Sequence, residues 1–180
     1  MRTMITLISL FLLFAFASIA QQPAELYTKI SLDELIENAE QYENKKVELI
    51  GLVVHICGVD GKKMKLKSPS GAIVKIVPND SNESYDSALK KQVVSVQGVV
   101  EISRIEKAEI DKVEKEKTLL CHIDNTPCKD KEWVNNKIES GADVTIVKKD
   151  IAKLRKQMET SGKDYVTCIC IRAEHVAILN

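Results

Sequence analysis

Aromatic residues are scarce in this chain, and their distribution is uneven. They make up 4% of its 180 residues, and all three phenylalanines, Phe11, Phe14 and Phe16, lie within the first twenty positions. The rest of the chain holds only Trp133 and four tyrosines. A core without phenylalanine must be built from Val, Ile and Leu, which suits a body rich in β-strands. The scarcity also leaves few of the stacking platforms that single-stranded nucleic-acid binding uses.

Net charge is absent as well. The chain has 26 basic and 26 acidic residues, so no overall field draws it to nucleic acid or to an acidic membrane surface. One local excess of positive charge is present, a stripe of lysines that we interpret as a solvated outer face: Lys62, Lys63, Lys65, Lys67 and Lys75. We therefore expect no nucleic-acid partner.

The sequence also has no recognisable catalytic motif. It contains no GxSxG or HExxH pattern and no glycine-rich phosphate loop. It has no CxxC pair of the kind that lowers a thiol pKa at a helix N-terminus. These absences predict a protein that is not an enzyme.

The first twenty residues have the pattern of a cleavable secretory signal. Arg2 gives a positive start, the segment 5–16 is almost entirely apolar, and Ser18 and Ala20 are small residues at the expected cleavage positions. No second apolar run follows, so we expect no membrane span after cleavage. This predicts a signal peptide at 1–20, a single domain at 21–180, and a periplasmic or secreted location.

The rest of the chain has the pattern of a mainly β protein with helices (α+β). A helix is expected at 31–42, and a helical insertion at about 106–164 with helices starting near Glu106, Thr126 and Asp150. Strands are expected where β-branched or alternating residues run between turn signals: 47–57, 63–67, 72–77, 93–105 and 165–171.

Gly51 and Gly98 lie within two of these expected strands, where barrels bend. Five strands in this order, with a helical insertion between the fourth and fifth, resemble an OB-fold, a small closed five-stranded barrel. The segments 54–64 and 121–128 are also similar to secreted bacterial OB-fold-like proteins of unassigned function. That second resemblance implies a location and a fold, and no activity.

Cysteines and histidines form three short clusters, at His55 and Cys57, at 121–128, and at Cys168 and Cys170. The middle cluster contains Cys121, His122 and Cys128 around a turn, so Cys121 and Cys128 could close a disulfide. Alternatively, these three residues with His55 or Cys57 could bind a zinc ion, although the spacing matches no established zinc signature. We expect no cofactor other than this zinc alternative.

The pair Cys168 and Cys170 is expected on one face of a strand, where residues two apart are poorly placed to form a disulfide with each other. We interpret both thiols as small hydrophobic groups facing the barrel core. His55 is expected to be satisfied by a backbone carbonyl.

Together these patterns predict an exported, non-catalytic binding or accessory module of the bacterial envelope, whose partner is an envelope protein or a second copy of the chain. Three alternatives remain: a zinc-type metal-binding protein, a thiol-redox protein, and a binder of single-stranded nucleic acid or oligosaccharide.

Overall fold

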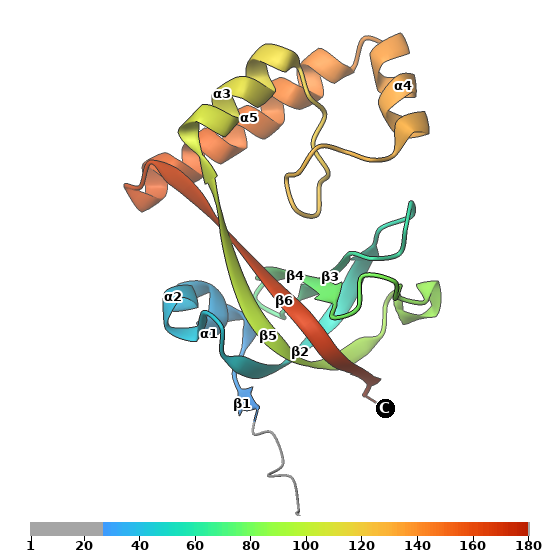
Figure 1. Ribbon diagram of the computed structural model, residues 1–180, viewed down its shortest axis with the longest axis vertical. Coiled ribbons are helices and arrows are strands. Elements are labelled where there is room, and N and C mark those ends of the chain that lie inside the picture. Colours follow the sequence, from blue (N-terminus) through green and yellow to red (C-terminus); the bar gives the residue numbers. More distant parts are fainter. Residues whose placement is uncertain (1–26, 180) are drawn as a thin grey trace, which may run out of the picture.

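A closed five-stranded barrel forms the body of the protein in the computed structural model, which describes residues 27–179 (Figure 1). The predicted signal peptide at 1–20 lies outside the described residues. In order along the chain, the barrel strands are β2 (Lys46–Ile56), β3 (Met64–Lys67), β4 (Ile73–Pro78), β5 (Val93–Glu106) and β6 (Tyr165–Ile178). Around the barrel their order is β2-β3-β4-β6-β5. A two-residue strand, β1 (Thr28–Lys29), lies parallel to β2 at the edge. The expected α+β, OB-like barrel is confirmed.

Closure comes from two pairings between strands distant in sequence. Strand β4 runs parallel to β6, and β2 pairs antiparallel with β5. Gly98 lies where the β5–β6 register shifts, and a Cβ atom there would lie 2.3 Å from the carbonyl oxygen of Arg172. Only glycine allows the two backbones to approach this closely. The bend expected at Gly98 is therefore present.

The barrel interior is filled by aliphatic side chains, as the scarcity of aromatics required. The buried set comes from every barrel strand and from α1 (Leu32–Glu37). Its largest members include Leu32, Leu35, Leu49, Met64, Leu66, Ile76 and Ile171. Helix α1 begins at the predicted cap, where the Ser31 hydroxyl accepts a hydrogen bond from the Glu34 N–H. The expected single helix is interrupted at Asn38 and resumes as α2 (Ala39–Tyr42).

A β-bulge near the end of β2 changes the direction of its last side chains. Val53 pairs with Leu66, but the next paired residue on β2 is His55, opposite Lys65. Strict alternation would place His55 on the inner face with Val53. The extra residue instead puts His55 on the outer face and returns Ile56 to the interior.

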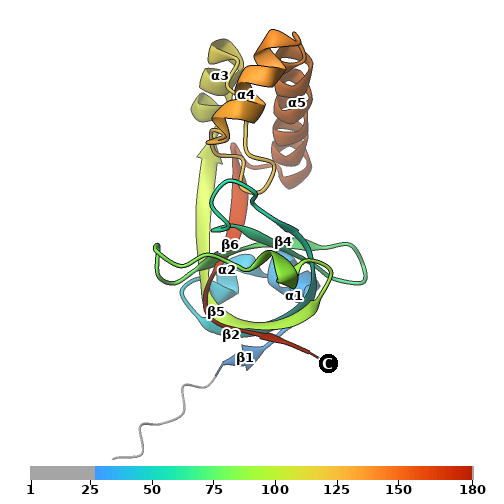
Figure 2. The same ribbon diagram turned by 90° about the vertical axis from the view of Figure 1, so that its right-hand side faces the viewer.

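Strands β5 and β6 extend beyond the barrel and carry a helical insertion (Figures 1 and 2). The insertion contains α3 (Lys107–Glu116), α4 (Lys131–Glu139) and α5 (Asp143–Ser161). It has its own buried core, formed by Ile110, Leu119, Leu120, Val147, Ile151, Leu154 and Val166.

Two of the helix starts expected in the insertion are wrong. Helix α4 is capped by Asp130, whose carboxylate accepts a hydrogen bond from the Trp133 N–H, so the helix begins after the expected Thr126 cap. Pro127 instead forms a β-bridge with Leu120. Helix α5 begins at Asp143, seven residues before the expected start at Asp150. It ends at Ser161, and Gly162 caps it in the left-handed conformation.

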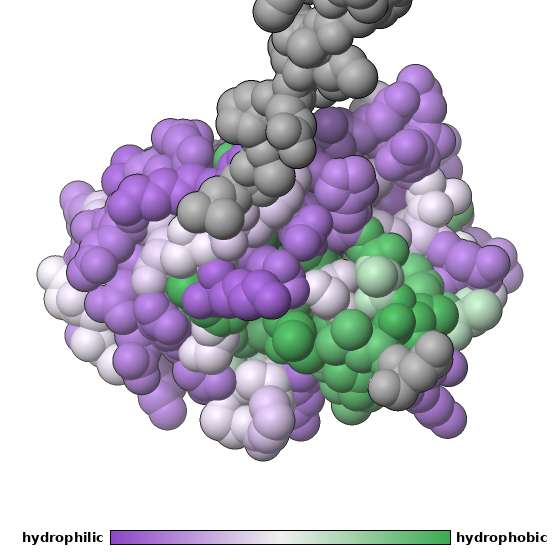
Figure 3. Space-filling view, turned by 90° about the horizontal axis from the view of Figure 1, so that it is seen from below, coloured by the Kyte–Doolittle hydropathy of each residue, from purple (hydrophilic) through white to green (hydrophobic). Residues whose placement is uncertain are grey.

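Large apolar side chains are exposed on β2, β5 and the C-terminal segment, where the space-filling view from below shows an apolar area (Figure 3). These side chains belong to Ile50, Leu52, Val93, Ile178 and Leu179. Among residues 27–179, none of the helices has the length and apolar character needed to cross a bilayer.

Candidate functional site

The turn-rich segment at 119–128, here called the docking loop, folds back from the insertion onto the outer face of β3 and β4. Asp124 in this loop forms an ion pair with Lys63 at 2.8 Å and lies 3.6 Å from the ammonium group of Lys75. Only 6% of the Asp124 side chain is exposed. The lysine stripe is therefore not a solvated face throughout, because an insertion carboxylate covers part of it.

The environment of Asp124 keeps it ionised. Burial alone would raise its pKa, but hydrogen bonds from Lys63 and Thr126 outweigh burial and lower the pKa to about 2. Both the hydroxyl and the backbone N–H of Thr126 donate to this carboxylate. Asp124 was not among the expected site residues, although Asp followed two residues later by Thr is typical of such a turn.

Lys65 occupies the centre of the same face and has a different environment. It lies directly opposite Lys75 in the strand register, and its ammonium group donates to the backbone carbonyl of His122. Among the described residues it makes no ion pair with a carboxylate. Burial lowers its pKa, and the nearby charge of Lys153 on α5 lowers it further. Lys65 is thus a partly buried cation without a matching carboxylate.

The outer-face position of His55 brings it to His122 of the docking loop. The two Nε2 atoms are 3.1 Å apart, and the rings meet edge to face at an interplanar angle of 71°. Burial lowers the pKa of both imidazoles, and the charge of Lys65 acts in the same direction. Both rings are therefore neutral near pH 7. The hydrogen-bond partner of His55 is an imidazole, not the expected backbone carbonyl.

The expected disulfide between Cys121 and Cys128 is wrong, because both thiols are free. The loop forms a short antiparallel pairing in which the Cys121 N–H donates to the Thr126 carbonyl and the Cys128 N–H donates to the Leu119 carbonyl. Cys121 and Cys128 are therefore diagonal neighbours across this pairing. Such residues are about 7–8 Å apart, which is too far for a disulfide.

Cys168 and Cys170 share a face of β6, but it is the outer face and not the barrel core. Their neighbours Ile169 and Ile171 point into the barrel, whereas Cys168 packs against the core of the insertion. Burial raises the pKa of Cys168, and raises that of Cys170 to about 11. Thiols held in this protonated form are poor nucleophiles, which disfavours the thiol-redox alternative.

Of the five residues predicted to bind metal, the structure brings the two histidines into contact. Within residues 27–179, no group of three or more His, Cys, Asp or Glu side chains is close enough to hold an ion. Cys57 lies on the outer side of the barrel, where its N–H donates to the Lys63 carbonyl. Cys121 is 3.9 Å from the Lys63 ammonium group. The five-residue zinc site stays a prediction, and the two imidazoles are the part of it that is assembled.

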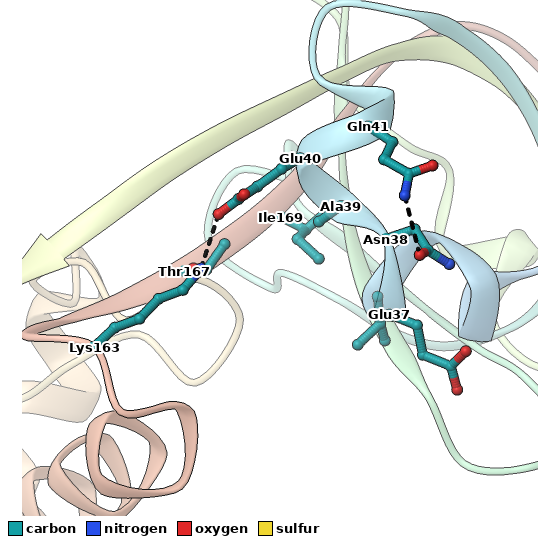
Figure 4. A pocket seen from close by; sticks show the side chains of 9 residues that line it. Glu37, Asn38, Ala39, Glu40, Gln41, Lys163, Thr167 and Ile169 are labelled. Carbon is teal, nitrogen blue, oxygen red and sulfur yellow. Dashed lines mark hydrogen bonds and ion pairs between the residues drawn. The ribbon is translucent and has the colours of Figure 1, made fainter.

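A second contact between barrel and insertion borders a cleft of about 390 Å³ (Figure 4). Here Glu40 on α2 pairs at 2.8 Å with Lys163, which follows α5. The cleft is also lined by Ile36, Glu37, Asn38, Ala39, Gln41, Thr167 and Ile169. Its one ammonium group is already paired with Glu40, so this contact has a simple structural role in joining α2 to the insertion.

The sequence matches no protein-family model and no curated protein. Among solved structures it is similar to a chain of the Stn1–Ten1 complex of S. pombe, with 13% identity and a TM-score of 0.31 over 42% of this chain and 65% of that one. It is also similar to the telomere capping protein Ten1 of the same organism, with 13% identity and a TM-score of 0.31 over 41% of this chain and 67% of that one. This chain thus spans about two thirds of the length of each.

These matches correct several predictions. Nothing in these matches supports export by a signal peptide, a periplasmic or secreted location, an envelope accessory role or the exclusion of nucleic acid, and these predictions are not retained. A TM-score of 0.31 carries no argument about the ligand of this chain. The case for a ligand class therefore depends on the site itself.

Proposed function

We propose that this protein is a non-catalytic binder of single-stranded nucleic acid. The bound nucleic acid would cross the outer face of β2, β3 and β4 beside the docking loop. OB-fold barrels bind oligonucleotides and oligosaccharides on this kind of face, between the loop after the first barrel strand and the loop before the last. In this chain those loops are 57–63 and the helical insertion. A positively charged face favours the anionic ligand of the two.

Two rows of outward side chains cross this face in the strand register. One row is His55, Lys65 and Lys75, and the next is Leu52, Lys67 and Ile73. The first row holds two ammonium groups beside the docking loop: that of Lys65 donates to the His122 carbonyl, and that of Lys75 lies 3.6 Å from Asp124. The second places a lysine between two exposed aliphatic side chains, against which bases can lie.

The observation that carries the proposal is the unbalanced charge of Lys65. Like charges directly opposite each other in a sheet are destabilising, and Lys65 faces Lys75 with Lys153 also close. Asp124 forms its ion pairs with Lys63 and Lys75, and its charge raises the pKa of Lys65 by less than burial and Lys153 lower it. A phosphate oxygen would supply the missing negative charge at that point.

The absence of aromatic residues from β2, β3 and β4 determines how binding should behave. Without stacking on rings, most of the affinity must come from phosphate contacts, and such contacts release counterions. We therefore expect weak binding that depends strongly on salt and little on base sequence.

The test is fluorescence anisotropy with a labelled oligothymidylate, measured at several salt concentrations. The logarithm of the association constant should fall with the logarithm of salt by about 0.7 per phosphate contact, so Lys65→Ala should make the slope shallower by about that amount. Lys29→Ala, on β1 and outside the two rows, is the matched control and should keep the full slope. The proposal is abandoned if no binding occurs at low salt, or if the two variants weaken binding equally.

A further inference from the structure

The contact between His55 and His122 has the geometry of two ligands prepared for one ion. Zinc–nitrogen bonds of about 2.0–2.1 Å at a tetrahedral angle place two nitrogens about 3.3 Å apart. The two Nε2 atoms already lie 3.1 Å apart. Insertion of an ion between them needs little change in the nitrogen separation, but the rings must rotate, because they now meet edge to face with their centroids 4.4 Å apart.

We propose that His55 and His122 form a site for a divalent transition-metal ion, which would clamp the helical insertion to the barrel. Imidazole nitrogen suits Zn²⁺, Ni²⁺ and Cu²⁺. Each ring would bind through Nε2, and water would fill the remaining positions. In the metal-free protein one Nε2 donates its hydrogen to the other, so that ring takes its Nδ1–H tautomer when the ion binds.

The backbone around each histidine supports this assignment independently of the distance. The β2 bulge turns His55 outward, and bulges of this kind commonly re-aim a side chain beside a functional site. His122 is exposed, and Lys65 holds its carbonyl in place. The site therefore joins two elements that are far apart in sequence and is open to solvent.

The charges around the pair determine its strength. Lys65 acts on both imidazoles and Lys90 on His55, whereas Asp124 and Asp150 act on His122 in the opposite direction. With two protein ligands and cations on one side, the affinity should be lower than that of a closed structural zinc site with four ligands. The ion would stabilise docking of the insertion without being required for folding.

The experiment is calorimetric titration of tag-free full-length protein with Zn²⁺ and Ni²⁺. Wild type should bind one ion per chain, and His55→Ala or His122→Ala should weaken binding about tenfold or more. His175→Ala removes the third histidine of the sequence, which lies on β6, and should bind as wild type does. Circular dichroism should verify that every variant is folded before titration.

Hydrogen exchange provides a second readout, because the ion should increase protection of 119–128 in wild type and in neither site variant. The proposal is overturned if wild type binds no ion, or if both histidine variants bind as tightly as wild type. It is also overturned if Cys57→Ser loses more affinity than either histidine variant, since a thiol would then be the main ligand.

Discussion

Asp124 of the insertion and Lys63 of the barrel approach to 2.8 Å, and both side chains are largely buried in the contact. The ammonium group of Lys75 lies 3.6 Å from the same carboxylate oxygen, Oδ2. One acidic side chain thus pairs with two lysines, and this group of three side chains keeps one positive charge. This relationship fixes the docking loop on the face where we propose that nucleic acid binds.

Asp124→Asn should loosen this contact. The amide keeps the size of the carboxylate but leaves Lys63 and Lys75 without a counter-charge in a partly buried place. We expect a loss of about 1–3 kcal/mol in the free energy of unfolding, measured by chemical denaturation. Hydrogen exchange at 119–128 should become faster.

Asp111→Asn is the control variant. It removes a similar carboxylate from an exposed pair with Arg155 and should change stability little. Equal effects of the two changes would contradict this account.

Gly98→Ala should be strongly destabilising, because its Cβ atom would lie 2.3 Å from the carbonyl oxygen of Arg172. The β5–β6 backbones must separate to admit it, at a cost of about 3 kcal/mol or more. A Cβ atom at Gly58 would have no heavy atom within 4 Å. Gly58→Ala should therefore leave the midpoint of thermal unfolding unchanged or slightly raised. A tolerated Gly98→Ala would show that the closure of the barrel is looser than described.

Leu154→Ala should weaken the insertion more than the barrel. Leu154 is 2% exposed within the core of the insertion, and loss of such a side chain costs about 2–5 kcal/mol. Exchange should accelerate in α3 and α5, while the barrel strands should keep more of their protection. Ile138→Ala, at a side chain that is 57% exposed, should change stability by less than about 0.5 kcal/mol. Equal acceleration in both parts would mean that barrel and insertion unfold as one unit.

The thiols should differ in their reaction with iodoacetamide, as followed by mass spectrometry of peptides. Cys57 and Cys128 are partly exposed and should react first. Cys170 is buried and its pKa is raised to about 11, so its thiolate fraction, and with it the rate, should still increase as pH rises beyond 10. In denaturant, Cys170 should react as fast as the other cysteines. Rapid modification of Cys170 in the folded protein near pH 8 would contradict its burial.

Much of the barrel could be predicted from the sequence because its signals are local. Alternation in 63–67 and the β-branched runs of 47–57 and 93–105 depend on neighbouring residues alone. A glycine within a strand indicates a close approach wherever its partner lies, as Gly98 does. The starts of the last two helices were less clear, because Asp130 and Asp143 compete with other polar residues as starting points.

The sequence by itself determined an aliphatic core, five strands, the irregularity at Gly98 and a helical insertion, since composition and periodicity decide which segments can bury apolar surface. Tertiary structure alone decided which face the insertion covers. The β2 bulge turned His55 outward to meet His122, and the docking loop brought Asp124 to lysines about fifty to sixty residues away in the chain. Contacts of this kind depend on the three-dimensional path of two strands that extend beyond the barrel, and no local pattern encodes that path.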